Sequence, residues 1–148
     1  MEIYAYAREF MARTGNPNQW GPTNWPPEEL IRKDIESGIS HVCMDHGEVA
    51  ACFVYFVGEE PDYREMLEGA WPDDRPYSVV HRIATKRGTH GVAKYCLEWV
   101  YDQRAPLRMD THKNNIPMQN LLRKCGFQKC GVIRIHEDGS LRDAFIHL

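Results

Sequence analysis

The residues best suited to bind a ligand lie between positions 108 and 127, where a short strand pattern is followed by a polar turn and a helix. The turn, residues 110–115, reads Asp-Thr-His-Lys-Asn-Asn. Pro117 suits the first turn of a helix because it has no N–H to donate, and Gly126 can end that helix with a positive φ. Free backbone groups converge where a strand ends and a helix begins, and α/β proteins commonly bind ligands there. We therefore predict a ligand-binding site at this turn.

A second candidate site is the basic, glycine-containing loop that enters a predicted helix at Val92. The first N–H groups of a helix have no partner within it, and the helix N-terminus carries a partial positive charge, so together they favour an anion. Gly91 would let the backbone approach that anion closely. The positive side chains of this region are Lys86, Arg87, His90 and Lys94. The alternative is an ordinary turn with solvated lysines.

Length and composition favour one domain, residues 1–148, that acts on a small ligand in the cytoplasm. The chain has 148 residues and a net charge of −3 without a dense Lys/Arg cluster, which argues against a nucleic-acid partner. Its five cysteines lie mostly in apolar runs, a pattern typical of reduced intracellular proteins. No apolar run approaches the roughly 20 residues of a membrane span, and the N-terminus lacks a signal-peptide pattern, so we expect no membrane partner.

Hydrophobic periodicity predicts alternating helices and strands, and these would position the two candidate sites. Helical spacing of apolar residues covers residues 2–13, 28–37, 59–71, 92–102 and 117–125. Strand patterns cover residues 41–44, 50–57, 78–84, 108–111, 128–135 and 143–148. The expected core-facing residues of the helix over 92–102 are Val92, Tyr95, Cys96, Trp99 and Val100.

The order of these elements resembles the GNAT family of acetyl-CoA-dependent N-acetyltransferases, in its small bacterial type. Residues 81–84 (His-Arg-Ile-Ala) and 86–93 (Lys-Arg-Gly-Thr-His-Gly-Val-Ala) are similar to the family's central strand and cofactor loop. The further matches are Asn115, Met118, Leu121 and the pair Gly126-Phe127. The resemblance implies an α/β (α+β) fold with a mixed, mostly antiparallel central sheet flanked by helices. The usual first strand is missing, because the helical pattern starts at Glu2.

The resemblance also implies acetyl-CoA as co-substrate and direct transfer of its acetyl group to an amine in a ternary complex. At the matching positions, the cofactor-binding residues would be Ile83, Ala84, Thr85, His90, Gly91, Val92, Ala93, Lys94, Asn115 and Leu122. Backbone N–H groups near the end of that strand would polarise the thioester carbonyl. Asn115 could also cap the following helix. The family's Gln/Arg in the loop is replaced here by Gly88, with Arg87 one position earlier.

The resemblance leaves the catalytic acid and base open. Where the family often has a Tyr that protonates the departing thiolate, this chain has Leu122, and the nearby Cys125 is more typical of packing. An amine is protonated at neutral pH, so it must lose a proton before it attacks. His81 and His112 are the candidate bases, because histidine as a residue type titrates near neutrality. Each could instead have a structural role, and a water relay is a further alternative.

The amine acceptor would be a small molecule or a peptide. Trp20 and Trp25, in the loop over residues 16–27, are candidates to line its pocket, although they could equally cover the sheet. Without the usual first strand, one sheet edge would be unpaired. An unpaired edge favours association, so we expect a homodimer or another cover for that edge.

Two other functions fit parts of the sequence. A non-catalytic acyl-CoA binding or sensing module would keep the fold and the cofactor loop, and Leu122 at the usual Tyr position favours it. His41, Cys43 and His46 could contact a metal, but a zinc site needs four suitably spaced ligands, so we expect no metal. Turnover of acetyl-CoA with an amine would distinguish an enzyme from a sensor.

Overall fold

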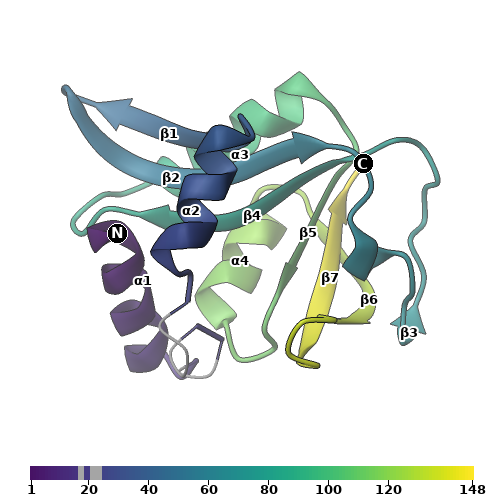
Figure 1. Ribbon diagram of the computed structural model, residues 1–148. Helices are drawn as coiled ribbons and strands as arrows, with labels where there is room; N and C mark the ends of the chain where they lie inside the picture. Colours follow the sequence, from purple (N-terminus) through teal and green to yellow (C-terminus); the bar gives the residue numbers. More distant parts are fainter. Residues whose placement is uncertain (17–18, 21–24) are drawn as a thin grey trace.

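The computed structural model describes residues 1–16, 19–20 and 25–148, and residues 17–18 and 21–24 of the predicted loop lie outside the described part. Its strands are β1 (Ser40–Asp45), β2 (Glu48–Val57), β3 (Glu68–Gly69), β4 (Ser78–Thr85), β5 (Leu107–Thr111), β6 (Gln128–Arg134) and β7 (Leu141–His147). They form one seven-stranded sheet in the order β1-β2-β4-β5-β7-β6-β3 (Figure 1). β4 and β5 are parallel, whereas the other neighbouring strands are antiparallel.

The helices of the described residues are α1 (Glu2–Arg13), α2 (Glu28–Glu36), the 3-10 helix η2 (Pro61–Tyr63), α3 (Val92–Gln103) and α4 (Ile116–Lys124). The predicted mixed, mostly antiparallel sheet flanked by helices is confirmed, and the α-helices begin and end within one residue of their predicted bounds. Within the described residues, none of these helices is long and apolar enough to cross a membrane.

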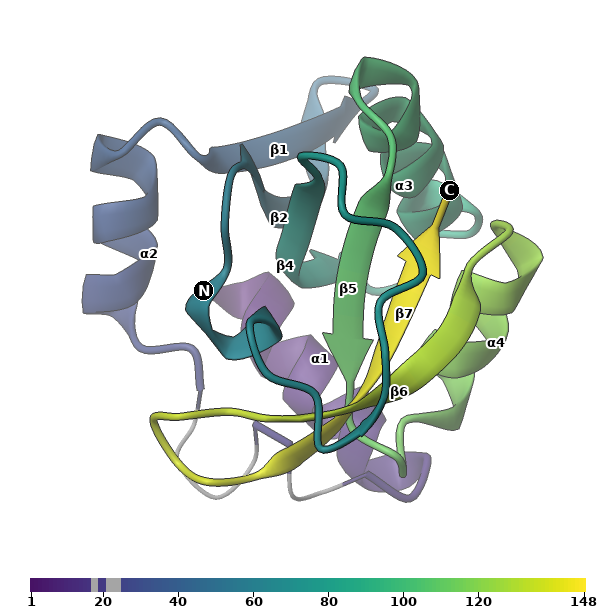
Figure 2. The same cartoon turned by 90° about the vertical axis from the view of Figure 1, so that its right-hand side faces the viewer.

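Helices cover both faces of the sheet (Figure 2). On one face, α3 and α4 bury Leu97 and Leu122 in the largest core cluster. On the other face, α1 packs through Tyr4 in a second cluster. Successive strand side chains point to opposite faces, so Ile83 of β4 joins the first cluster and its neighbour Ala84 joins the second. The end of β4 is therefore enclosed from both sides.

The predicted helix over residues 59–71 is wrong. The segment that joins β2 to β4, residues 58–77, contains η2 and the two-residue strand β3, which pairs with β6. The helical spacing is misleading because Tyr63 and Met66 pack separately onto a third cluster of the sheet, while Leu67 is 46% exposed. Contacts with the sheet have thus overridden the local pattern. We call residues 58–77 the cover segment.

Close contacts with the sheet hold the cover segment in place. Gly69 of β3 and Gly131 of β6 approach so closely that a Cβ on either would lie 2.1 Å from a backbone oxygen of the other strand. The guanidinium of Arg108 in β5 lies 4.2 Å from the ring centre of Trp71 and 3.9 Å from that of Tyr77. Cation–π contacts of this kind stabilise by about 0.5–2 kcal/mol each.

The predicted core-facing side of α3 is confirmed for Val92, which packs against the core, and for the buried Cys96 and Val100. Tyr95 and Trp99 are 62% and 40% exposed, whereas Cys96, Leu97 and Val100 are buried. α3 packs against β2 and β4. The prediction is therefore wrong for Tyr95 and Trp99, and it omits the buried Leu97.

β1 and β3 are the two edges of the sheet. The first element of the chain is helix α1, as predicted. No described strand pairs with the outer side of β1, where Val42 and Met44 are 56% and 55% exposed. The homodimer that such an edge favours stays a prediction.

Candidate active site

The sheet opens between the carboxyl ends of β4 and β5. These strands pair in parallel where they begin, Ser78 with Leu107 and Val79 with Arg108. Further along, β4 stays paired with β2 and β5 with β7. The facing backbone groups of β4 and β5 are thereby available to a ligand. A cavity of about 540 Å³, bordered by both strands, lies at this opening.

A bulge at Arg82 interrupts β4 beside the cavity. Arg82 has a φ of 50°, uncommon for a residue with a side chain, and the register with β2 shifts opposite it. Its Nε and Nη2 donate to Asp34 Oδ2 of α2 at 3.1 and 2.8 Å. Its carbonyl accepts a hydrogen bond from the Tyr4 hydroxyl of α1 at 3.2 Å. Two helices therefore fix the backbone just before residues 83–85, the predicted thioester-binding groups.

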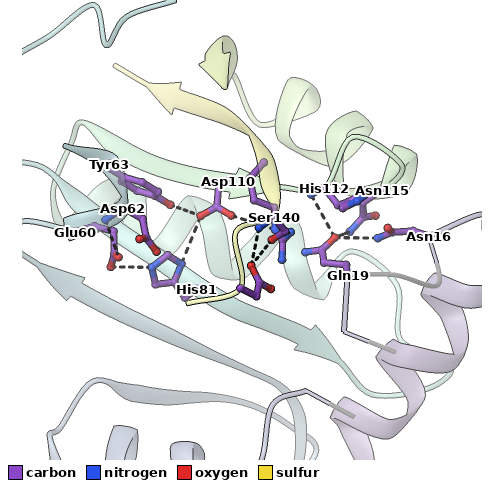
Figure 3. Close-up of polar contacts among 12 residues, drawn as sticks. Asn16, Gln19, Glu60, Asp62, Tyr63, His81, Asp110, His112, Asn115 and Ser140 are labelled. Carbon is purple, nitrogen blue, oxygen red and sulfur yellow. Dashed lines mark hydrogen bonds and ion pairs between the residues drawn. The ribbon is translucent and has the colours of Figure 1, made fainter. Parts of the chain in front are cut away.

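His81 of β4 lies between two carboxylates in the cavity wall (Figure 3). Its Nε2 is 3.1 Å from Glu60 Oε2 of the cover segment, and its Nδ1 is 3.9 Å from Asp110 Oδ2 of β5. The second distance is too long for a hydrogen bond. The buried hydroxyl of Tyr63 donates to Asp110 Oδ2 at 2.7 Å. The side chains of His81, Glu60 and Asp110 are 22%, 17% and 10% exposed, so water screens these charges weakly.

Glu60 determines which nitrogen of His81 carries a proton. Burial alone would raise the pKa of Glu60, but its hydrogen bond and charge interaction with His81, together with smaller interactions, lower that pKa below its ordinary value. The carboxylate is therefore ionised near neutral pH and can only accept a hydrogen bond, so Nε2 of His81 is the donor. In the neutral ring, Nδ1 is then free to accept a proton.

The N-terminus of α3 has the features of the predicted anion site. Gly91 precedes it with a φ of 72°, and a Cβ there would meet no described atom within 4 Å. No described side chain caps this helix. The backbone N–H groups of Val92, Ala93 and Lys94 therefore lack helical partners and can bind a phosphate. His90, which precedes Gly91, is exposed. These residues fit the pyrophosphate of coenzyme A.

The positive side chains near this helix are engaged in surface ion pairs. The pairs are Lys86–Glu48, Arg87–Glu9 and Lys94–Glu98. Exposed pairs of this kind contribute only about 0–1 kcal/mol, so a phosphate could replace a carboxylate partner at small cost. The predicted contribution of these cations to phosphate binding therefore stays open to test.

The predicted cofactor residues of the second half of the chain lie in different surroundings. Asn115 borders the cavity, and its Oδ1 also caps α4 by accepting the Met118 N–H at 3.2 Å. Both roles foreseen for Asn115 are thus compatible with its position. Leu122 is fully buried in the core beneath α4. A contact between Leu122 and acetyl-CoA stays a prediction that this burial does not favour.

His112 does not border the described cavity. Its Nδ1 accepts the backbone N–H of Asn114 at 3.1 Å, which fits a structural role in the turn. Burial is the main cause that lowers the pKa of His112, so the ring is neutral near pH 7. With Nδ1 already engaged and the ring outside the cavity, the geometry favours His81 over His112 as the base.

Trp20 and Trp25 both border the cavity, on the side formed by α1 and α2. Trp20 is 7% exposed and meets the Tyr4 ring edge-on at 5.9 Å between centres. The Trp20 ring therefore covers the sheet and borders the cavity, and its contact with an acceptor stays a prediction.

Several residues of the cavity wall were missed by the sequence reasoning. They are Glu60, Asp62, Glu137, Asp138 and Arg142. Glu60 and Asp62 belong to the cover segment, for which the apolar spacing wrongly predicts a helix. The signal that could have found most of these residues is the gathering of carboxylates in the loops at 59–62 and 137–138, both next to strands.

The alternative metal site is not assembled in the described part of the chain. His41 stacks on Phe53 at 5.5 Å between ring centres. Among the described residues, no group of three or more His, Cys, Asp and Glu side chains converges as metal ligands would.

A mixed sheet that opens beside an uncapped helix N-terminus is the arrangement expected of an acyl-CoA N-acyltransferase. A GNAT family acetyltransferase structure from Streptococcus agalactiae is 31% identical, with a TM-score of 0.90 over 100% of this chain and 87% of that chain. One from Elizabethkingia anophelis, solved with acetyl-CoA bound, shares the fold at 17% identity, with a TM-score of 0.59 over 83% of this chain and 84% of that chain. No family sequence profile matches the chain.

A streptothricin acetyltransferase from Escherichia coli is 29% identical over 92 residues, which make up 60% of this chain. The match spans about half of that relative's length, 53%. Together with the similarity over the whole chain to the streptococcal protein, these findings show that the chain belongs to the GNAT family. The resemblance predicted from the sequence is confirmed.

Proposed function

We propose that this protein transfers the acetyl group of acetyl-CoA directly to an amine acceptor in a ternary complex. The observation that carries the proposal is that β4 and β5 separate beside the cavity that holds His81, and that β4 leads through residues 86–91 into the uncapped N-terminus of α3. The acetyltransferase relatives support the same activity. Acetyl-CoA would lie along the opening, with its thioester near residues 83–85.

In the proposed mechanism, the acceptor enters as an ammonium group and gives one proton to His81 Nδ1. Glu60 accepts the hydrogen bond from Nε2 and stabilises the positive charge that the ring acquires. The free amine attacks the thioester carbonyl, and backbone N–H groups after the Arg82 bulge stabilise the negative oxygen. The C–S bond then breaks, and the second proton of the new amide nitrogen passes through water to the departing CoA thiolate, because no Tyr stands at position 122. His81 returns the first proton to solvent.

A panel of amines tests the activity. Purified protein is mixed with acetyl-CoA and small-molecule or peptide amines, with streptothricin among them because of the similarity to the Escherichia coli relative. Release of the CoA thiol is followed, and the acetylated acceptor is identified by mass spectrometry. The proposal predicts amine-dependent thiol release. Tight binding of acetyl-CoA without turnover over the whole panel would instead favour the sensing module.

We further propose that the protein works in the cytoplasm. All five cysteines are described and none forms a disulfide. Reduced thiols are typical of intracellular proteins, where glutathione and thioredoxin keep them reduced. Localisation of a tagged full-length chain in cell fractions would test this assignment.

A further inference from the structure

The wall of the cavity beside His81 is acidic. Five carboxylates border the cavity, Glu60 and Asp62 from the cover segment, Asp110 from β5, and Glu137 and Asp138 from the β6–β7 turn. The overall charge of the chain is only −3, so the cavity concentrates negative charge beyond the average of the surface. A pocket lined by charges of one sign attracts ligands of the opposite sign.

Positive side chains at the cavity leave most of this charge uncompensated. Arg82 borders the cavity, but its guanidinium is bonded to Asp34, which is buried. Arg142 Nε lies 3.8 Å from Asp110 Oδ1 and can offset that carboxylate. His81 faces Glu60 and carries a charge only when protonated. The cavity therefore has a negative balance.

The carboxylates form two groups at different depths. Glu60 and Asp110 flank His81 and have side chains only 17% and 10% exposed. Glu137 and Asp138 are exposed on the β6–β7 turn, at the rim of the cavity. Within the described part of the chain, Glu137 makes no hydrogen bond or ion pair. Its carboxylate is therefore available to a ligand.

The rim is held to the cover segment rather than left loose. Asp62 Oδ1 accepts the backbone N–H of His136 at 3.1 Å and lies 3.0 Å from His136 Nδ1. Asp138 Oδ1 accepts the backbone N–H of Ser140 at 2.9 Å and its hydroxyl at 2.6 Å. The turn that carries Glu137 thus has a defined position relative to His81.

An unpartnered polar group lies at the end of β5. Thr111 borders the cavity and is 1% exposed, and its hydroxyl has no hydrogen-bond partner among the described residues. Buried hydroxyls normally have a partner, so an unsatisfied one beside a cavity points to a ligand group. The amine of a bound acceptor, or another polar group of the same acceptor molecule, could provide that partner.

We infer that the acceptor is a dicationic amine, whose reacting amine lies at His81 while a second positive group lies against Glu137 and Asp138. This inference rests on the proposed acetyltransferase function and names the substrate class of the same cavity. An amine with a single positive charge would lie near the inner carboxylates, Glu60 and Asp110, and would leave Glu137 and Asp138 at the rim without a cationic partner. The second cation would add an interaction at the rim and so raise kcat/KM.

A matched pair of acceptors tests the inference. Diaminopentane and pentylamine have the same chain length and similar amine basicity, and differ in the second charge. After correction for the two equivalent amines, kcat/KM for diaminopentane should exceed that for pentylamine by about fivefold or more at low salt, and the ratio should shrink at high salt. Equal kcat/KM for the two acceptors would overturn the inference.

Glu137→Gln locates the effect at the rim. The variant should lower kcat/KM for diaminopentane about two- to fivefold and lower kcat/KM for pentylamine much less, so that the ratio of the two values falls. Glu36→Gln, which removes an exposed carboxylate of α2 outside the cavity, should change neither. If the ratio of kcat/KM for diaminopentane to that for pentylamine were the same in Glu137→Gln as in the wild type, the inference would be overturned, whereas the proposed function would stand. Failure to acetylate any amine of the panel would overturn the proposed function, and the inference with it.

Discussion

The hydrogen bond between Glu60 and Nε2 of His81 leaves Nδ1 as the nitrogen that can take a proton from the acceptor. A base within reach of the reacting amine typically contributes about 10²–10⁴-fold to a rate. We therefore expect His81→Asn to lower kcat at least about 100-fold while KM for acetyl-CoA changes little. Steady-state kinetics between pH 6.5 and 9.5 would measure this. The loss should narrow at high pH, where more of the acceptor is already unprotonated.

His112→Asn makes the comparison between the two candidate bases direct. Because Nδ1 of His112 is engaged with the Asn114 backbone, this variant should change kcat much less than His81→Asn does. If the His112 variant lost more activity than the His81 variant, the assignment of the base would be wrong.

At the residue scale, the sequence indicates which residue types could act as a base, but not which side chains they contact. His81 could be chosen because histidine titrates near neutrality and lies on the central strand. Its partner Glu60 is 21 positions earlier in the chain, in a segment whose spacing imitates a helix. No local pattern indicates that such a residue meets His81. Long-range pairing of this kind depends on how the cover segment packs.

The N-terminus of α3 can be tested as a phosphate site by placing a negative charge on it. Gly91→Glu adds a carboxylate beside the free N–H groups and should weaken acetyl-CoA binding at least about tenfold, measured by calorimetry. Gly38→Glu is the matched control, since Gly38 also has a positive φ, 74° against 72°, and equally open surroundings. Equal affinity of the two variants for acetyl-CoA would argue against this placement of the site.

The contact between β3 and β6 determines whether the cover segment stays in place. In Gly131→Ala the new Cβ would lie 2.1 Å from the Glu68 backbone oxygen, so the two strands must separate. We expect a loss of about 1–3 kcal/mol in the free energy of unfolding, measured by urea denaturation. Hydrogen exchange should show faster opening of residues 58–77, with a larger loss of protection there than in α3. Unchanged exchange in the cover segment would contradict this account of its docking.

At the element scale, strong hydrophobic periodicity predicts the helices and strands that position the cavity. The cover segment was not predicted, because its structure depends on contacts with the sheet. α1, α3 and α4 each carry an apolar stripe long enough to identify them. Residues 59–71 have apolar residues at similar spacing, but Tyr63 and Met66 serve an irregular segment over the sheet. Periodicity alone cannot distinguish the two cases, because it does not report what the segment packs against.

For the molecule as a whole, we expect stability to fall with mild acid. Burial lowers the pKa of His147, so the folded state binds a proton less readily than the unfolded chain. The unfolded state then takes up more protons as pH falls below the ordinary histidine pKa of about 6.5. The stabilising contribution is present above that pH and is lost as the pH falls toward the lowered pKa.

His147→Phe tests this linkage and keeps an aromatic ring against Tyr101, on which His147 stacks at 3.7 Å between ring centres. The decrease in the free energy of unfolding between pH 7.5 and 5.5 should be smaller in this variant than in the wild type. His46→Gln, at a side chain that is 94% exposed, should leave the decrease unchanged. If the free energy of unfolding decreased equally in His147→Phe and in the wild type, His147 would not contribute to the pH dependence of stability.

The central claim, that this GNAT family member transfers acetyl groups from acetyl-CoA to an amine, is tested most directly by following the acetyl group itself. Acetyl-CoA labelled in its acetyl carbon is incubated with the protein and the amine panel, and the CoA thiol and labelled amide are both quantified. We predict one labelled amide for each CoA released, with both products reduced together in His81→Asn. Acetyl-CoA binding without any labelled amide, or CoA release without amide, would contradict the account.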